Sequence, residues 1–206
     1  MDAKGFYREA PAICRLRVPF EGIYTSVFLI EADGKRILVD CAMTAADVEG
    51  IILPALAARG LSPTDIDTLV LTHRHGDHAG GLDAILQHAP AIRVVTAPDE
   101  TLADGILTYP LGGHTADSIG VLDTHTGTLI SGDGLQGEGV DKYPCYTQDP
   151  EMYVQTLERI LNDDRIESIL FSHAYAPWNS DRATGRDLVI DCTKQCIAYQ
   201  ERIENK

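Results

Sequence analysis

The sequence predicts a layered α/β domain in which helices cover a sheet, and three observations lead to this fold class. At 206 residues the chain is long enough for one well-buried domain. Hydrophobic residues make up 44% and charged residues 23%, as is typical of a globular protein. Strand-like and helical segments alternate in both halves, and no linker or low-complexity segment interrupts them. We therefore expect a single domain spanning residues 1–206.

The strand-like segments share β-branched, aromatic or continuously apolar residues between turn-forming ones. They are Ile13–Val18, Thr25–Ala32, Arg36–Asp40, Asp67–Thr72, Ile119–Thr124, Gly127–Asp133 and Ser168–His173. The sequence ADGK supplies a hairpin turn after the second segment, and HTGT supplies a turn before the sixth. Asp67–Thr72 and Ser168–His173 are short apolar runs, which indicates strands buried on both faces.

The helical segments are recognised by apolar residues three and four positions apart. One covers Ala45–Arg59, where Pro54 should kink the helix. A second follows the glycines at positions 80 and 81, a third begins near Pro150 with Asp149 as its start signal, and a fourth occupies the end of the chain. Their apolar positions are Val48, Ile51, Ile52, Ala55; Leu82, Ile85, Leu86, Ala89; Tyr153, Leu157, Ile160, Leu161; and Val189, Cys192, Cys196, Tyr199, Ile203.

Charge and composition exclude several classes of partner. The 31 acidic residues outnumber the 17 Lys and Arg residues, for a net charge of -14, so the chain repels nucleic acid. Neither a signal-peptide core nor a run of about 18 apolar residues is present, so we expect no membrane segment and a cytoplasmic protein. The five scattered cysteines do not suggest a disulfide framework, and Cys192 and Cys196 are interpreted as small buried apolar residues. The expected partner is a small-molecule substrate, and assembly into a homo-oligomer stays open.

The segment VLTHRHGDHAGGL, from Val70 to Leu82, places three histidines and an aspartate within six residues. In extended chain His73 and His75 face the same side, and a following turn can bring Asp77 and His78 to the same cavity. Imidazole nitrogen and carboxylate oxygen are the ligands that zinc-like ions favour. The sequence therefore predicts a metal site here.

Further candidate ligands follow other predicted strands or lie in glycine-rich turns. They are His114 in LGGHTADS, Asp133 in LISGDG and His173 in LFSHA. The two remaining histidines, His88 and His125, are interpreted as solvated surface residues.

These motifs resemble the metallo-β-lactamase superfamily, and within it the small glyoxalase II-like or lactonase-like hydrolases. The signature H-x-H-x-D-H stands here as His73-Arg-His75-Gly-Asp77-His78, and the resemblance extends from about Tyr24 to His173. It implies a four-layer αββα sandwich. It also implies that His73, His75 and His114 hold one metal, that Asp77, His78 and His173 hold a second, and that Asp133 bridges them.

Two carboxylates outside the signature are open to two interpretations each. Asp40 ends a strand as in the family, and it either orients a ligand histidine or is an ordinary turn carboxylate. The family turn PGHTPGS is here GGHTADS, which introduces Asp117. A turn cap is favoured for Asp117 over a contact with a substrate cation.

Two divalent ions that share a bridging oxygen lower the pKa of water towards ~7, which generates hydroxide at neutral pH. The chain has no G-x-S-x-G elbow for a serine nucleophile. We therefore expect a dinuclear metal-dependent hydrolase in which a metal-bridging hydroxide attacks a small ester, lactone or thioester. Asp77 would orient the attacking water or pass on a proton, as in relatives. Zinc is the expected metal, with manganese and iron as alternatives.

Two other functions stay open. The chain would be an iron oxidoreductase of the persulfide dioxygenase type if a single iron used His73, His114 and Asp133. A non-catalytic metal-binding or regulatory protein is the third hypothesis. Zinc β-lactamases of the commonest type carry Cys where Asp133 stands, and flavodiiron proteins carry Glu in place of His75, which disfavours both.

Substrate specificity is expected in two loops that follow ligands, residues 134–149 and 174–187. Four aromatic residues of these loops either line a pocket or pin the loops by packing. They are Tyr143, Tyr146, Tyr175 and Trp178.

Overall fold

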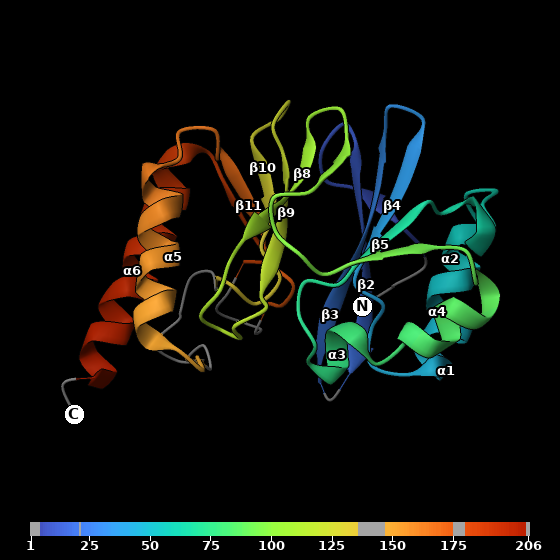
Figure 1. The fold of residues 1–206 in the computed structure, drawn as a ribbon, viewed down its shortest axis with the longest axis horizontal. Coiled ribbons are helices and arrows are strands. Elements are labelled where there is room, and N and C mark those ends of the chain that lie inside the picture. Colours follow the sequence, from blue (N-terminus) through green and yellow to red (C-terminus); the bar gives the residue numbers. More distant parts are fainter. Residues whose placement is uncertain (1–4, 21, 136–146, 175–179, 205–206) are drawn as a thin grey trace. The chain divides into compact units, whose positions relative to one another are not determined.

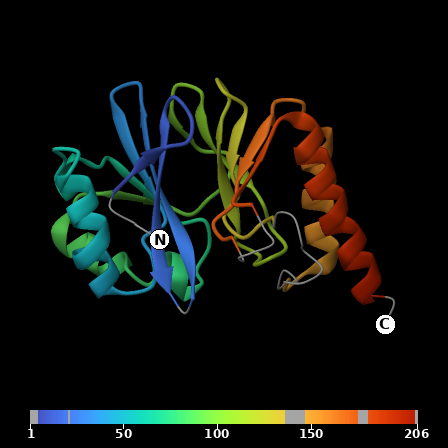
Figure 2. The same ribbon diagram turned by 180° about the vertical axis from the view of Figure 1, so that it is seen from behind.

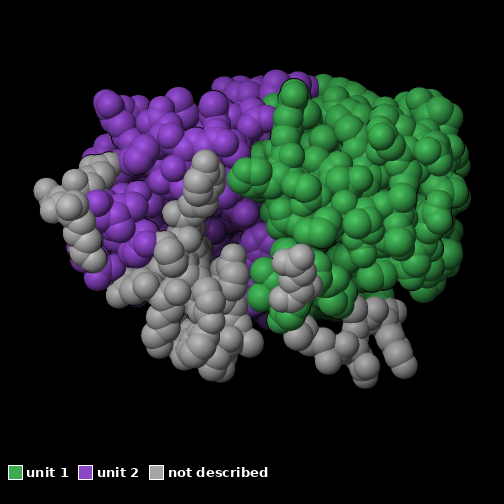
Figure 3. All heavy atoms as spheres, turned by 90° about the horizontal axis from the view of Figure 1, so that it is seen from below, with its two compact units in different colours: residues 1–96, 102–104 green, residues 97–101, 105–206 purple. Residues whose placement is uncertain are grey.

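A computed structural model describes residues 5–20, 22–135, 147–174 and 180–204, and the chain divides into two compact units (Figures 1 and 3). Unit 1 contains residues 1–96 and 102–104, and unit 2 contains residues 97–101 and 105–206. Each unit has its own hydrophobic core between a sheet and the helices packed on it. Both units are thus α/β, as the alternation of segments predicts. None of the helices in the described ranges has the length and apolarity needed to cross a bilayer.

The sheet of unit 1 has the order β1-β2-β3-β4-β5-β6. Its strands are β1 (Tyr7–Arg8), β2 (Ile13–Phe20), β3 (Ile23–Ala32), β4 (Lys35–Val39), β5 (Thr68–Val70) and β6 (Arg93–Val95). The strands from β1 to β4 pair antiparallel, whereas β4, β5 and β6 pair parallel. Parallel neighbours end at the same edge of a sheet. Asp40 and the segment with His73 therefore leave the sheet side by side.

Helices cover one face of this sheet (Figure 1). They include α1 (Ala45–Asp47), α2 (Leu53–Ala57) and α4 (Leu82–His88), while the short α3 (Gly76–Ala79) follows the H-x-H motif. Leu16, Val27 and Leu38 of the strands are buried together with Ile52 and Leu56. This shared core fixes the strand ends from which the candidate ligands project.

The predicted helix over residues 45–59 is interrupted before Pro54. The segment Val48–Ile52 is a π-helical turn, in which the N–H of Leu53 donates to the carbonyl of Val48, five residues back. Pro54 stands in the first turn of α2, where its missing N–H leaves no hydrogen bond unmade. The irregularity therefore comes from the wide turn that precedes the proline.

Gly80 permits a close approach between the chain after α3 and the chain after β4. A Cβ atom at this position would overlap the carbonyl oxygens of Met43 and Gly76, and backbone atoms cannot move away as a flexible side chain would. We expect Gly80→Ala to lower the free energy of unfolding by about 3 kcal/mol, measured by urea denaturation. Gly50→Ala is the control, because a Cβ there meets nothing within 4 Å. Equal stability of the two variants would contradict this account.

The sheet of unit 2 has the order β12-β11-β10-β9-β8-β7. Its strands are β7 (Thr101–Ala103), β8 (Ile106–Pro110), β9 (Ile119–Asp123), β10 (Thr128–Ile130), β11 (Ser168–Leu170) and β12 (Arg182–Thr184). Here β10 and β11 form a parallel pair, while β8, β9 and β10 pair antiparallel. The chain segments with Asp133 and His173 consequently leave the sheet at one edge.

Helices α5 (Pro150–Asn162) and α6 (Arg186–Glu204) lie side by side on this sheet (Figures 1 and 2). The predicted start signal is confirmed, because the Asp149 side chain accepts a hydrogen bond from the N–H of Met152. Cys192 and Cys196 are buried in the core of unit 2, as predicted. The side of α6 that carries these two cysteines therefore belongs to the core of unit 2.

An ion pair closes the turn after α5. Arg165 Nε lies 2.8 Å from Asp163 Oδ1, Arg165 Nη2 lies 2.6 Å from Oδ2, and the Tyr109 hydroxyl donates to Oδ2 across 3.2 Å. The hydrogen bonds from Arg165 lower the pKa of the Asp163 carboxyl below its ordinary value, although partial burial opposes this change. The pair therefore links unit 2 stability to pH.

Because the folded pKa of Asp163 lies below its unfolded value of about 3.9, its contribution to stability is complete above about pH 4 and is lost as the pH falls through the folded pKa. Since Arg165 is largely exposed, we expect Asp163→Asn to cost about 1 kcal/mol at pH 7. The difference from the wild type should shrink at pH 3 in urea denaturation. Asp164→Asn, which changes a fully exposed side chain, should have no such effect.

Candidate metal centre

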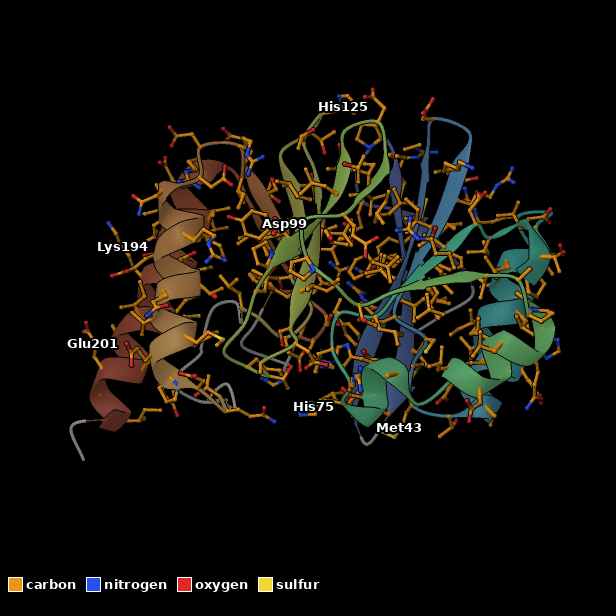
Figure 4. The ribbon with its side chains drawn as sticks, viewed as in Figure 1. Met43, His75, Asp99, His125, Lys194 and Glu201 are labelled. Atoms are coloured by element: carbon orange, nitrogen blue, oxygen red, sulfur yellow. The ribbon has the colours of Figure 1, made fainter. Side chains whose placement is uncertain are left out.

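The first group of candidate ligands follows β5 in unit 1. His73 Nε2 lies 3.0 Å from His75 Nδ1, so the two imidazoles face each other as their spacing predicts. His78 Nε2 lies 3.3 Å from Asp77 Oδ2. Figure 4 shows His75 beside α3, where it occupies the N-cap position with an extended backbone. The four predicted ligands of unit 1 therefore form two pairs of donor atoms.

The chemistry of these pairs suits a divalent cation. Two ring nitrogens 3.0 Å apart either share a proton or direct their lone pairs towards one cation. His73 and His78 are buried, while His75 and Asp77 are partly exposed, so each pair combines a fixed donor with one that solvent reaches. Zinc and similar ions bind such nitrogen and oxygen donors. The residues present thus fit the metal that their sequence pattern implies.

Asp40 contacts Nδ1 of His78, the ring nitrogen that does not face Asp77. Its Oδ2 lies 2.8 Å from His78 Nδ1 and accepts the Thr72 hydroxyl across 2.9 Å, while Oδ1 accepts the Thr72 backbone N–H across 2.8 Å. The Asp40 backbone has a φ of 64°, a left-handed conformation that Asp tolerates better than most residues. These contacts favour the orienting role over that of a simple turn carboxylate.

The second group of candidate ligands belongs to unit 2. His114 follows β8, Asp133 follows β10 and His173 follows β11. Asp133 Oδ1 lies 3.1 Å from His173 Nε2, and its Oδ2 lies 3.6 Å from His114 Nε2. Asp133 therefore presents one carboxylate oxygen to each histidine, as a bridging ligand would.

A glycine and local hydrogen bonds shape the turn that carries His114. Gly113 has a φ of 129°, and a Cβ there would overlap the backbone of Tyr153, so this position requires glycine. Thr115 Oγ1 donates to Asp117 Oδ1 across 2.7 Å, and the Thr115 N–H donates to Ser118 Oγ across 3.1 Å. The exposed Asp117 thus accepts a hydrogen bond from within its own turn, which agrees better with a role in the turn than with a contact to a substrate cation.

The structure also tests the remaining predictions about individual residues. His88 and His125 are exposed, as predicted, and Figure 4 shows His125 at the turn between β9 and β10. Tyr143, Tyr146, Tyr175 and Trp178 lie outside the described residues. Thr72, which the sequence did not single out, bonds to Asp40 and contacts His73. Its position directly before the H-x-H motif is the signal that could have identified it.

Comparisons with known proteins agree with this pattern. The family model of the metallo-beta-lactamase superfamily matches residues 21–105, which include Asp40 and the ligands of unit 1. The uncharacterized protein YobT of Bacillus subtilis is 26% identical over 83% of this chain and 80% of its own length. The beta-lactamase-like protein 2 homolog of Drosophila melanogaster is 31% identical over 67% of this chain.

A hydroxyacylglutathione hydrolase of Xanthomonas campestris is 26% identical over 74% of this chain. The chain spans 61% of that enzyme and 54% of the Drosophila protein, so their activities enter only as support for a proposal.

Solved structures share the fold at low sequence identity. The metallo-beta-lactamase FIM-1 of Pseudomonas aeruginosa, solved in a mono-zinc form, covers 98% of this chain at a TM-score of 0.72 and 16% identity, and the match spans 96% of FIM-1. The rubredoxin oxygen:oxidoreductase of Desulfovibrio gigas gives the same TM-score at 18% identity, over 95% of this chain and 61% of its own.

The likeness to FIM-1 confirms the predicted α/β fold class. The match of the family model and the similarity of the named relatives show that the chain belongs to the metallo-β-lactamase superfamily.

Proposed function

We propose that the chain is a metal-dependent hydrolase that cleaves a small ester, lactone or thioester. The observation that carries this proposal is the pairing of donor atoms, in which His73 Nε2 faces His75 Nδ1 at 3.0 Å. Asp133 repeats the pattern with one oxygen towards each of two histidines. Such donor sets bind divalent cations, and hydrolysis is the chemistry that two adjacent cations support best.

The ligand assignment follows the order of ligands in the family. His73, His75 and His114 would hold one metal, and Asp77, His78 and His173 would hold the other, with Asp133 shared. When bound, the metals would lower the pKa of water and polarise the carbonyl group under attack. Asp77, partly exposed at the start of α3, would orient the attacking water through its carboxylate.

The substrate class rests on the relatives. The similar Xanthomonas protein is named a hydroxyacylglutathione hydrolase, and an acylglutathione is a thioester. Small esters and lactones place a similarly activated carbonyl in front of the nucleophile. A panel of these three classes therefore covers the proposed reaction.

The test begins with metal content, because it separates the candidate functions before any substrate is known. Protein purified without chelators or a metal-affinity tag should contain two equivalents of zinc, or of zinc and manganese, by elemental mass spectrometry. Chelation should abolish turnover of the panel, and zinc should restore it. Protein that binds no metal after soaking in zinc would overturn the proposal.

The fold also occurs in an oxidoreductase of Desulfovibrio gigas. The alternative to a hydrolase is therefore an oxidoreductase in which a single iron would use His73, His114 and Asp133. One equivalent of iron per chain, together with oxygen consumption on a persulfide substrate, would replace the hydrolase by this function.

A further inference from the structure

A chain of hydrogen bonds in unit 1 runs from Asp40 through Thr72 to His73. Thr72 Oγ1 lies 2.9 Å from Asp40 Oδ2 and 3.1 Å from His73 Nδ1. The exposed fractions of Asp40, Thr72 and His73 are 0%, 1% and 2%, so water does not compete for these bonds. Each member therefore depends on its neighbours to satisfy its polar atoms.

The protons of this chain can be assigned one by one. An ionised carboxylate only accepts hydrogen bonds, so Thr72 Oγ1 donates its single proton to Asp40. The hydroxyl can then only accept from His73, which places a proton on His73 Nδ1. A neutral imidazole carries one N–H, so His73 Nε2 presents a lone pair. By the same reasoning, His78 Nδ1 donates to Asp40 and His78 Nε2 presents a lone pair.

This tautomer of His73 matters because of what its Nε2 faces. His75 Nδ1 lies 3.0 Å away on a partly exposed side chain. If His73 carried its proton on Nε2, that proton would point at His75 and occupy the position of a cation. The buried hydroxyl of Thr72 excludes this state.

We propose that Thr72 is a positioning residue that fixes the ligand tautomer of His73, using the negative charge of Asp40. The buried carboxylate of Asp40 then sets the tautomer of both His73 and His78. In the proposed function, on which this consequence rests, these two histidines bind different metals. The two proposed metal sites are thus linked through Asp40. His78 Nδ1 lies 2.8 Å from the carboxylate and 3.5 Å from the Thr72 hydroxyl, whereas His73 is connected to the carboxylate through that hydroxyl.

The test compares Thr72→Val, which keeps the shape and removes the hydroxyl, with Thr72→Ser, which retains it. Thr108→Val is the matched control, because Thr108 is also buried and its hydroxyl donates to the Ala97 carbonyl across 2.9 Å, within unit 2. The readout is the ¹⁵N chemical shift of the His73 ring nitrogens in the metal-free full-length protein, which reports the tautomer directly. Stepwise zinc titration follows on the same samples.

Wild type, Thr72→Ser and Thr108→Val should show His73 protonated on Nδ1 alone, whereas Thr72→Val should show a mixture of tautomers. Thr72→Val should also raise one of the two zinc dissociation constants by about 10- to 100-fold, which means weaker binding, and leave the other unchanged. A pure Nδ1–H tautomer of His73 in Thr72→Val would overturn the proposal. An equal rise of both zinc dissociation constants would overturn it as well. Absence of zinc binding in every variant would refute the proposed function, while the tautomer result would still stand.

Discussion

Replacement of Asp133 by asparagine is expected to reduce hydrolytic turnover on the order of 10³-fold, because a metal that stabilises developing charge contributes several kcal/mol and each ~1.36 kcal/mol is worth tenfold in rate. Asn retains the shape of Asp but replaces one carboxylate oxygen by an NH₂ donor and removes the charge. It cannot serve both His114 and His173, each of which faces a separate Asp133 oxygen. Metal content by elemental mass spectrometry should fall together with turnover on the ester, lactone and thioester panel.

Asp164→Asn is the control for this change, because it removes the same charge from a fully exposed position of unit 2. Its metal content and turnover should match those of the wild type. Full metal occupancy in Asp133→Asn, with unchanged turnover, would refute the bridging role. If both variants lost metal equally, net charge would be the cause and not a shared ligand.

The second large effect is expected for Asp40→Asn. The substitution places an amide in a buried site where the carboxylate accepts from Thr72 and His78. One of its atoms becomes a donor that faces other donors, so the free energy of unfolding should fall by about 3 kcal/mol. Loss of the carboxylate should also weaken metal binding by about 10- to 100-fold. Urea denaturation of the metal-free protein and zinc titration measure the two effects separately.

Asp33→Asn provides a matched control. Asp33 also has a positive φ, of 50°, but it is exposed in the hairpin turn between β3 and β4. Asn tolerates the left-handed conformation as well as Asp does, so backbone preference is the same at both positions. A stability loss in Asp33→Asn as large as that in Asp40→Asn would assign the effect to the turn conformation and not to the buried hydrogen bonds.

The long helices and the ligand types were predictable because both leave strong local signals. The apolar face of α5 follows helical spacing, and its cap is set by Asp149, one residue before Pro150. The short strands β8 and β12 were not predicted, because a few residues paired within a sheet leave little periodicity of their own. The π-helical turn before Pro54 was missed for a similar reason, since its wide hydrogen bonds depend on packing.

The candidate ligands were predictable as residues but their partners were not. The sequence shows that Asp40 ends a strand, yet its contact with His78 joins residues 38 positions apart and depends on the parallel pairing of β4 and β5. Thr72 carries no motif of its own, and its role becomes visible only when its hydroxyl is seen between a carboxylate and an imidazole. The orientation of a ligand side chain depends on tertiary contacts, whereas its ligand chemistry depends on the residue type alone.

The parallel pairing of β4 and β5 also has a consequence for folding. Asp40 meets Thr72 across 32 residues, so this contact forms only after the intervening chain has been gathered into a closed loop. Contacts between distant positions along the chain are formed slowly compared with those inside a helix or hairpin. We therefore expect the H-x-H-x-D-H segment to remain an unoriented group of histidines until β4 and β5 have paired. A peptide of that segment alone would carry the candidate ligands without the Asp40 carboxylate that orients them in the folded protein.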